Sequence, residues 1–224
     1  MKTINIAIDG PAGAGKSSIA KAVSAQLGYI YVDTGALYRA VALYLTENNI
    51  PDEDIPDSLT AAGVSLGFID GTQRVFLNER DVSDLIRTPE ISMAASRTSA
   101  IPAVREYLFE TQRKIARENN IIMDGRDIGT VVLPNADIKL FVTASPEERA
   151  LRRHRELAEK PNCPPYEEIL KDIIKRDEND MNRAVSPLKQ AEDAILIDTT
   201  GMDLKQSTEF IVGIINDKLD RSAE

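Results

Sequence analysis

One segment near the start of the chain restricts the possible folds more than any other, and it reads Gly10-Pro11-Ala12-Gly13-Ala14-Gly15-Lys16-Ser17. It matches the phosphate-binding pattern G-x-x-x-x-G-K-[ST] at every constrained position. A mostly apolar run, Ile4–Ile8, precedes it and a helix-favouring run, Ser18–Leu27, follows. This strand–loop–helix context distinguishes a true P-loop from a glycine-rich turn that binds nothing. The segment therefore predicts a nucleoside triphosphate site.

The residue types of this loop suit phosphate and metal binding. Glycines let successive backbone N–H groups turn toward phosphate oxygens, and the helix that opens near Lys16 adds the positive end of its dipole. We expect Lys16 to reach the β- and γ-phosphates and the Ser17 hydroxyl to bind Mg²⁺. The predicted triphosphate-binding residues are Gly10, Pro11, Ala12, Gly13, Ala14, Gly15, Lys16, Ser17 and Ser18.

Short apolar runs alternate with helix-favouring segments along most of the chain. Further strands are predicted at Tyr29–Val32, Ile121–Met123, Ile138–Thr143 and Ala194–Ile197. Further helices are predicted at Ala36–Asn48, Val104–Asn119, Pro146–Glu159, Tyr166–Arg183 and Leu204–Leu219. This alternation is typical of an α/β fold, and it predicts a five-stranded parallel sheet with helices on both faces. Ligands should then bind beyond the carboxyl ends of the strands.

Residues 57–100 interrupt this alternation of predicted strands and helices. Val64–Ile69 and Arg74–Leu77 predict a hairpin through a short glycine-containing loop, followed by a shorter strand ending at Val82 and a helix over Pro89–Ser99. Pro51–Pro56 reads as a polar connection. We expect a small β-containing insertion packed on the main sheet.

The net charge of −9 argues against a surface that binds nucleic acid, so any phosphate site must be a local basic island. One cysteine, Cys163, excludes an internal disulfide and a multi-cysteine zinc site. No run approaches the ~18 apolar residues of a membrane span, and the residues before Asp9 are too few for a signal peptide. We expect a cytoplasmic monomer that binds neither nucleic acid nor membrane.

Polar residues cluster where the predicted strands end. Asp33 or Thr34 can cap the next helix, which carries Arg39 about one turn on. Asp124 follows another strand and suits a place at Mg²⁺, where its carboxylate would hold metal-bound water. Two sets of charged residues each share a helix face: Arg149, Arg152 and Arg153, and Arg176, Asp180 and Arg183.

A solvated surface charge is the usual role of any single helical arginine. Phosphoryl transfer, however, requires several convergent arginines and Mg²⁺, because the protein must position two anions and screen the moving group. Arg39, Arg126 and Arg183 can all lie on the P-loop side of the sheet and meet around a second phosphate. Two phosphate sites suggest transfer from one nucleotide to another phosphorylated molecule.

Four segments together resemble the bacterial cytidylate kinases: GPAGAGKS (10–17), DTGALYR (33–39), DGRDIGTVV (124–132) and RDENDMNR (176–183). The resemblance covers nearly the whole chain, and the last two segments are far more selective than the P-loop. It implies a core of residues 1–56, 101–145 and 184–224, a nucleoside-monophosphate-binding insertion at 57–100 and a short helical lid at 146–183.

The resemblance also implies a reaction, the transfer of the γ-phosphoryl group of Mg-ATP to CMP or dCMP in pyrimidine nucleotide metabolism. The implied CMP-binding residues are Asp33, Arg39, Ser96, Arg105, Arg126, Asp127, Arg176, Asp180 and Arg183. Among them Arg39, Arg126 and Arg183 would hold the phosphate; Asp180, helped by Arg176, would contact the ribose; and Ser96, Arg105 and Asp127 would read cytosine. Lys16, Arg126, Arg149 and Arg153 would be catalytic, and Arg152 would bind ATP.

The chemistry of the base supports the cytosine assignment. Cytosine carries an amino donor that an Asp127 carboxylate can accept and ring acceptors that Arg105 can donate to. Uracil presents a carbonyl at the same position and would be repelled. Two alternatives remain: a kinase of this fold for another acceptor, such as UMP or shikimate, and a GTP-binding switch. The switch would require a guanine-reading N-K-x-D element, which the sequence lacks.

Overall fold

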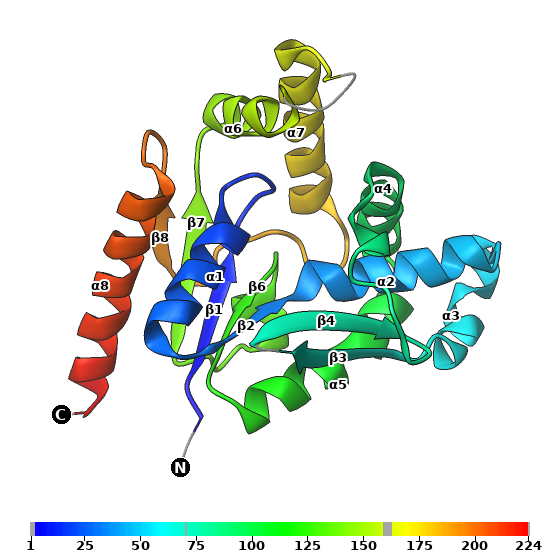
Figure 1. Cartoon of the computed structure of the whole chain (residues 1–224), viewed down its shortest axis with the longest axis horizontal. Helices are drawn as coiled ribbons and strands as arrows, with labels where there is room; N and C mark the ends of the chain where they lie inside the picture. The colour runs from blue at the N-terminus through cyan, green and yellow to red at the C-terminus, as the bar shows by residue number, and fades with distance from the viewer. Residues whose placement is uncertain (1–2, 70, 159–162, 224) are drawn as a thin grey trace.

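A computed structural model describes residues 3–69, 71–158 and 163–223 (Figure 1). Its main sheet has the strand order β2-β6-β1-β7-β8, and every neighbouring pair is parallel. The strands are β1 (Asn5–Asp9), β2 (Ile30–Asp33), β6 (Ile121–Asp124), β7 (Ile138–Thr143) and β8 (Ile195–Asp198). The predicted five-stranded parallel sheet is confirmed, with the strand that leads into the P-loop at its centre.

Helices cover both faces of this sheet. On one face α1 (Lys16–Leu27) and α8 (Leu204–Ala223) bury Ile6 and Ile8 of β1. On the other face α5 (Pro102–Glu118) and a π-helical turn, Ile128–Val132, bury Ala7 of the same strand. This alternation follows from the two-residue period of a strand, and both faces are apolar because both are covered.

Four of the five parallel strands end in aspartate, namely Asp9, Asp33, Asp124 and Asp198. Because parallel strands bring their carboxyl ends to one edge, these side chains lie along the same border of the sheet. The lid helices α6 (Pro146–Ala158) and α7 (Tyr166–Asn182) rise above this border (Figure 1). Any ligand bound by the strand-end loops therefore lies between the sheet and the lid.

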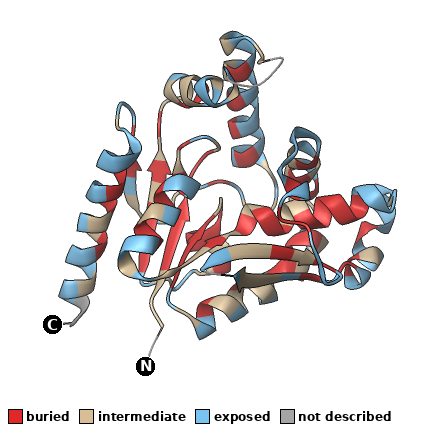
Figure 2. Cartoon of the chain, in the orientation of Figure 1, coloured by how far each residue is buried: buried red, intermediate tan, exposed pale blue. Residues whose placement is uncertain are grey.

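Helix α2 (Thr34–Glu47) is capped by Asp33, whose Oδ1 accepts a hydrogen bond from the Ala36 N–H at 3.1 Å, so of the two predicted cap residues it is Asp33 that caps the helix. The helix is buried along most of its length, as Figure 2 shows. The insertion surrounds it with an antiparallel sheet of β3 (Val64–Ile69), β4 (Thr72–Leu77) and β5 (Arg80–Asp81) and with α4 (Pro89–Thr98). The insertion thus packs mainly on α2 rather than on the main sheet, because α2 is apolar almost all round.

The predicted polar connection at Pro51–Pro56 is more ordered than expected. It contains a 3₁₀ turn, Asp52–Asp54, and enters a short helix α3 (Ile55–Ser58), followed by a second 3₁₀ turn, Leu59–Ala61. Pro56 lies in the first turn of α3, where a proline costs no helical hydrogen bond. The apolar side chain of Ile55 is 1% exposed, which explains why a polar-looking segment folds onto the core.

The lid is a helical hairpin with a small core of its own. Ala150 of α6 packs against Ile169 and Ile173 of α7. Residues 159–162 of the predicted lid, which include the predicted end of its first helix at Glu159, lie outside the described part of the chain. Cys163 is a half-buried free thiol. The division into core, insertion and lid stays a prediction.

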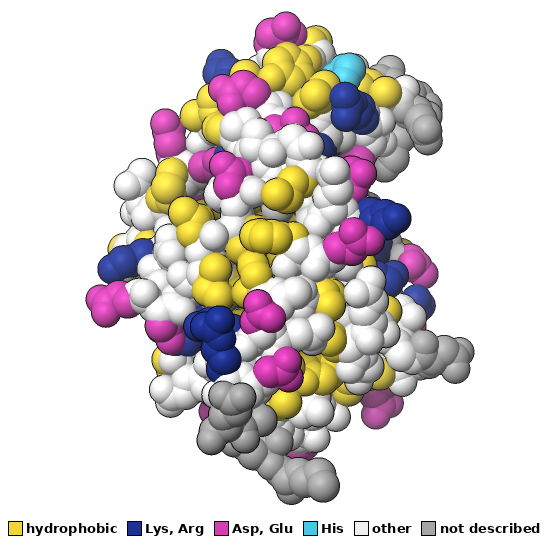
Figure 3. Space-filling view, turned by 90° about the vertical axis from the view of Figure 1, so that its left-hand side faces the viewer, with side chains coloured by type: hydrophobic (Ala, Val, Ile, Leu, Met, Phe, Trp, Pro, Cys, Tyr) yellow, Lys and Arg dark blue, Asp and Glu magenta, His cyan; other side chains and the backbone are white. Residues whose placement is uncertain are grey.

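The face formed by β8 and α8 carries exposed hydrophobic side chains, Leu196, Leu204 and Phe210. Figure 3 shows hydrophobic side chains gathered in the middle of this side of the molecule, with acidic and basic groups scattered around them. Among the described residues, none of the helices combines the length and the apolar character needed to cross a lipid bilayer.

Candidate active site

The P-loop has a backbone that only glycine accommodates. Gly10, Gly13 and Gly15 have φ angles of 144°, 76° and 82°, values that other residues rarely adopt. A Cβ on Gly10 would also lie 1.9 Å from the Val142 carbonyl oxygen. The glycines therefore allow the loop a left-handed backbone and a path close to β7, and a backbone of this kind can present N–H groups to a phosphate.

Lys16 lies at the base of this loop and is only 4% exposed. Its Nζ donates a hydrogen bond to the Pro11 carbonyl oxygen at 2.6 Å. Burial, and next the nearby Arg126 guanidinium, lower the pKa of the Lys16 ammonium well below its usual value. A buried ammonium next to an arginine is a centre of positive charge that a phosphate anion would stabilise.

Ser17 and Asp124 form the candidate metal position. The Ser17 hydroxyl donates to Asp124 Oδ2 at 2.7 Å, and the Tyr31 hydroxyl donates to Oδ1 at 3.1 Å. Burial, and next the negative charge of Asp33, raise the pKa of Asp124 to about 6. A hydroxyl and a carboxylate that forms no ion pair with the described residues are hard oxygen donors beside the P-loop, and this donor set fits a hydrated Mg²⁺.

Asp33 and Arg39 form an ion pair at 2.8 Å at the start of α2. The insertion holds this strand end in place through Gln73 of β4. The Asp33 N–H donates to Gln73 Oε1 at 2.8 Å, and Gln73 Nε2 donates back to the Asp33 carbonyl at 3.1 Å. Asp33 thus connects the insertion, through Gln73, with Arg39 of helix α2.

Arg126, Arg176 and Asp180 meet beside this pair. Arg126 Nε donates to Asp180 Oδ2 at 2.9 Å. Arg176 is exposed over the residue as a whole, yet the surrounding protein desolvates its guanidinium. That desolvation and, next, repulsion by Arg126 and Arg39 lower its pKa. Arg39, Arg126 and Arg176 therefore lie close to one another. The grouping of Arg39, Arg126 and Arg183 around a second phosphate stays a prediction.

A second cluster is buried more deeply. Arg105 of α5, 2% exposed, forms an ion pair with Asp127, and Arg183 Nη2 lies 3.6 Å from the other oxygen of that carboxylate. The Arg105 guanidinium also stacks 5.4 Å from the centre of the Tyr38 ring and donates to the Ser99 carbonyl. A buried carboxylate and guanidinium pointing to one place provide both an acceptor and donors for a polar base edge.

The three lid arginines do not share one environment. Arg149 is buried and forms two hydrogen bonds with Asp177, at 3.0 and 2.6 Å, and a third with the Ala12 carbonyl of the P-loop at 3.1 Å. Arg152 donates to the Thr199 carbonyl beyond β8. Arg153 is half exposed and pairs with Glu156. The shared face predicted from spacing is therefore divided, because Arg149 faces the P-loop and Arg153 faces solvent.

Comparison with known proteins identifies the family of the chain. The cytidylate kinase family profile matches residues 6–217. The chain belongs to the cytidylate kinase family. It is 50% identical to the cytidylate kinase of Carboxydothermus hydrogenoformans over 97% of this chain and 99% of the relative. It is 52% identical to that of Caldicellulosiruptor bescii over 95% of both chains.

The fold extends beyond close relatives of this cytidylate kinase family member. A solved shikimate kinase from Bacteroides thetaiotaomicron shares 14% identity and a TM-score of 0.50, with 97% of this chain and 98% of that one covered. At this identity the likeness concerns the fold alone, and it agrees with the P-loop kinase architecture predicted from the sequence.

Several residues of the cytidylate kinase site had no individual role in the sequence-based predictions. Tyr31 and Gln73 carry no motif signal, and only the fold brings them to Asp124 and Asp33. Asp177 of α7 lies inside the quoted segment 176–183, and nothing in that segment indicates its pairing with Arg149. Ser96 is half-buried on α4, one turn before Ser99, which places it near Arg105.

Asp9, the last residue of β1, also escaped prediction. Its two oxygens accept hydrogen bonds from the N–H groups of Ile128 and Gly129, each at 2.7 Å. Burial raises the pKa of Asp9 to about 6, although the two N–H donors oppose the rise. At neutral pH the cytidylate kinase family member thus keeps a buried negative charge at a cost in stability.

This shift predicts a pH dependence of stability. The pKa of Asp9 is higher in the folded chain than in the unfolded chain, so its favourable contribution is complete below pH 3.8 and is lost as the pH rises through about 6. Between pH 7 and pH 5 we expect Asp9 to add about 1.4 kcal/mol to the free energy of unfolding. Urea titrations of wild type and Asp9→Asn at both pH values would measure it. An equal pH dependence in the two proteins would contradict the assignment.

Proposed function

We propose that this chain transfers the γ-phosphoryl group of ATP to the phosphate of CMP or dCMP. The single observation that carries this function is the meeting of two different anion sites at the carboxyl edge of the sheet. The P-loop with Lys16 lies beside Arg126, and Arg126 belongs to the group of arginines that would hold a second phosphate. Membership of the cytidylate kinase family supports the choice of cytidine nucleotides.

The donor half would consist of the P-loop, Lys16, Ser17 and Arg152. Inward-turned N–H groups would cradle the ATP phosphates, and Lys16 would exchange its hydrogen bond with Pro11 for the phosphates. The Ser17 hydroxyl would hold Mg²⁺ directly and the Asp124 carboxylate would hold it through water, and the ion would supply positive charge that neutralises the ATP phosphates. Arg152 already lies against the loop beyond β8, beside Gly15.

The acceptor half would hold the CMP phosphate with Arg39, Arg126 and Arg183. Asp180 lies against Arg126 and, helped by Arg176, would contact the ribose. The buried pair of Arg105 and Asp127 would read cytosine, with Ser96 at its border. Asp33 would orient Arg39 through their ion pair, and it is the part of the acceptor site that the insertion holds.

The lid would complete the reaction centre. Arg149 already contacts the P-loop backbone, and Arg153 would have to move from Glu156 to reach the transferred group. Such a movement would bring positive charge to the transition state and exclude water, which limits wasteful ATP hydrolysis. The expectation that the chain acts in the cytoplasm as a monomer remains a prediction.

A panel of acceptors tests the proposed function. With Mg-ATP as donor and coupled detection of ADP, we expect CMP and dCMP to be phosphorylated with a kcat/KM at least about tenfold above that of UMP. AMP and shikimate should give only the background rate, and chelation of Mg²⁺ should abolish turnover of CMP. Faster turnover of UMP or shikimate than of CMP would reject the cytidine assignment.

A further inference from the structure

We propose that Asp9 is a positioning residue that fixes the cytosine-reading turn to the strand that carries the P-loop. The inference rests on the proposed function, because it takes Asp127 to be the carboxylate that reads the base. Asp9 itself lies beneath the turn and would not touch either nucleotide. Its role would be to set where Asp127 stands relative to the donor site.

The hydrogen bonds of Asp9 define this link. Oδ1 accepts from the Ile128 N–H and Oδ2 from the Gly129 N–H, each at 2.7 Å. These two amides directly follow Asp127, and they open the π-helical turn Ile128–Val132. A carboxylate that accepts two adjacent backbone N–H groups fixes both the height and the orientation of the turn. In the sequence, Asp9 directly precedes Gly10, the first residue of the P-loop.

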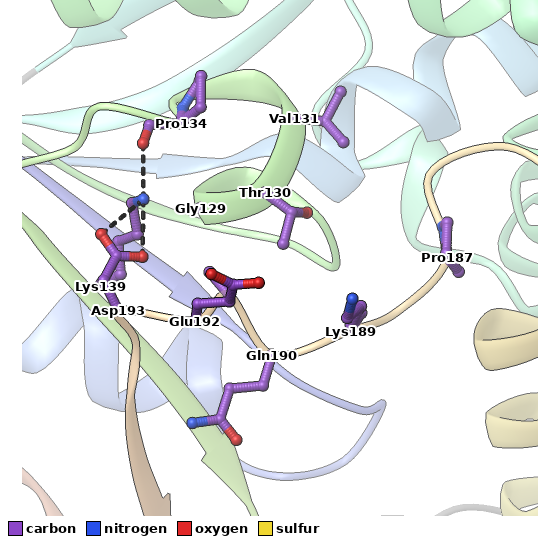
Figure 4. Close-up of a pocket in the computed structure, with 11 residues that line it drawn as sticks. Gly129, Thr130, Val131, Pro134, Lys139, Pro187, Lys189, Gln190, Glu192 and Asp193 are labelled. Atoms are coloured by element: carbon purple, nitrogen blue, oxygen red, sulfur yellow. Dashed lines mark hydrogen bonds and ion pairs between the residues drawn. The ribbon is translucent and has the colours of Figure 1, made fainter.

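Arg113 holds the far end of the turn by donating to the Val131 and Val132 carbonyl oxygens, so Asp9 supplies the side-chain hydrogen bonds at the end next to Asp127. A pocket of about 380 Å³ lies beside the turn (Figure 4). Gly129, Thr130 and Val131 line it from the turn, opposite the loop that carries Lys189 and Asp193. The Thr130 hydroxyl is buried and makes no hydrogen bond with the described residues. The turn therefore has room to shift toward the pocket if its bonds to Asp9 are weakened.

Among the groups around Asp9, its principal partners are the backbone N–H groups of Ile128 and Gly129. Lys16 faces it from α1 and Asp127 from the turn, and their effects on Asp9 have opposite sign. Lys139 of β7 passes close to Gly129, but its Nζ is directed away, to the Pro134 carbonyl at 2.6 Å and to Asp193 at 2.8 Å (Figure 4). No described cation forms an ion pair with Asp9, so the buried charge is held mainly by the two N–H groups.

A shift of the turn would alter base reading before it altered the donor site. Asp127 holds Arg105 and Arg183 in one buried cluster, so a displacement of Asp127 would misplace all three groups. The P-loop, by contrast, is anchored through the backbone of β1 and its own glycines, which a change of the Asp9 side chain leaves in place. This difference separates a positioning role from a general loss of structure.

Asp9→Asn is the variant that tests the proposal. Asparagine keeps the shape but can accept only one of the two N–H groups, and its amide would present a donor to the other. We expect the KM for CMP to rise about tenfold and the CMP-to-UMP preference to fall by a similar factor. The KM for ATP and the kcat at saturating CMP should change by less than about threefold. The matched control is Asp137→Asn, which removes the charge from a carboxylate that accepts the Asn5 N–H at the opposite end of β1 and should leave every constant unchanged.

Gly129→Ala gives a second, independent disturbance of the same contact. Its Cβ would lie 3.1 Å from Lys139 Cδ and 3.3 Å from Asp9 Oδ2, so the turn must give way while Asp9 keeps its charge. We expect the same narrowing of the CMP-to-UMP preference in this variant. Thermal unfolding curves would confirm that the assayed proteins are folded at the assay temperature. Gly129→Ala provides the test if Asp9→Asn does not fold.

The outcomes distinguish a failure of the proposed function from a failure of the positioning role of Asp9. A wild type that phosphorylates UMP faster than CMP would overturn the proposed function, and this inference with it. A wild type that prefers CMP, together with folded variants that keep both this preference and the KM for CMP, would overturn the inference alone. Equal rises in the KM for ATP and for CMP would also overturn it, because they would place the effect in the P-loop.

Discussion

Replacement of Lys16 by alanine should lower kcat by at least about three orders of magnitude while changing the KM for CMP by less than about threefold. Lys16 is buried at the base of the P-loop, and its ammonium donates to the Pro11 carbonyl of the loop that would hold the donor phosphates. Charge on the transferred group grows in the transition state, so an interaction made mainly there affects turnover rather than acceptor binding.

The measurement is a steady-state assay with Mg-ATP and CMP, complemented by CMP binding measured without ATP. Lys21→Ala provides the matched control, because Lys21 lies on the same helix with its side chain exposed to solvent. It should retain wild-type turnover. A Lys16→Ala protein with a kcat close to that of wild type would remove Lys16 from the chemistry.

Asp127→Asn should produce the second large effect. Removal of this charge leaves Arg105 buried without its carboxylate and deprives Arg183 of its nearest acidic partner in this cluster. We expect the free energy of unfolding to fall by about 3 kcal/mol, because a buried charge becomes uncompensated. We expect kcat/KM for CMP to fall about 100-fold and the CMP-to-UMP preference to narrow, since an amide can turn a donor toward the uracil carbonyl.

Urea unfolding and assays with CMP and UMP would measure both effects. Asp52→Asn is the matched control, because it removes the carboxylate of an exposed pair with Arg97, in which both side chains are more than 60% exposed. Such a pair contributes at most about 1 kcal/mol, and this one lies outside the proposed site. A folded Asp127→Asn protein with an unchanged CMP-to-UMP preference would place base recognition elsewhere.

The pairing of the acceptor-site arginines explains how an acidic chain can contain a basic site. Arg39, Arg105, Arg126 and Arg183 each lie against a carboxylate of the same site. These carboxylates orient the guanidinium groups and limit the repulsion among them. Binding of a nucleotide phosphate would then require an exchange of partners, which makes acceptor binding sensitive to the geometry of each pair.

The P-loop, the five parallel strands and the cap at Asp33 were all predictable from the sequence. Each depends on residues that are neighbours in the chain: glycine spacing, short apolar runs, or a side chain that bonds the backbone three residues on. The gathering of the polar strand ends at one edge of the sheet was also predictable. It follows from one rule, that parallel strands place their carboxyl ends together, once the strands are recognised.

The tertiary structure alone decided which groups hold these residues in place. Gln73 reaches Asp33 across 40 positions, Tyr31 reaches Asp124 across 93, and Asp9 reaches Ile128 across 119. Single hydrogen bonds of this kind leave no periodic pattern in a sequence, because they depend on the packing of whole elements. For the same reason the insertion was expected on the sheet but packs on α2. The P-loop could thus be predicted directly from the sequence, whereas the partners of Asp9, the residue just before it, were shown only by the tertiary structure.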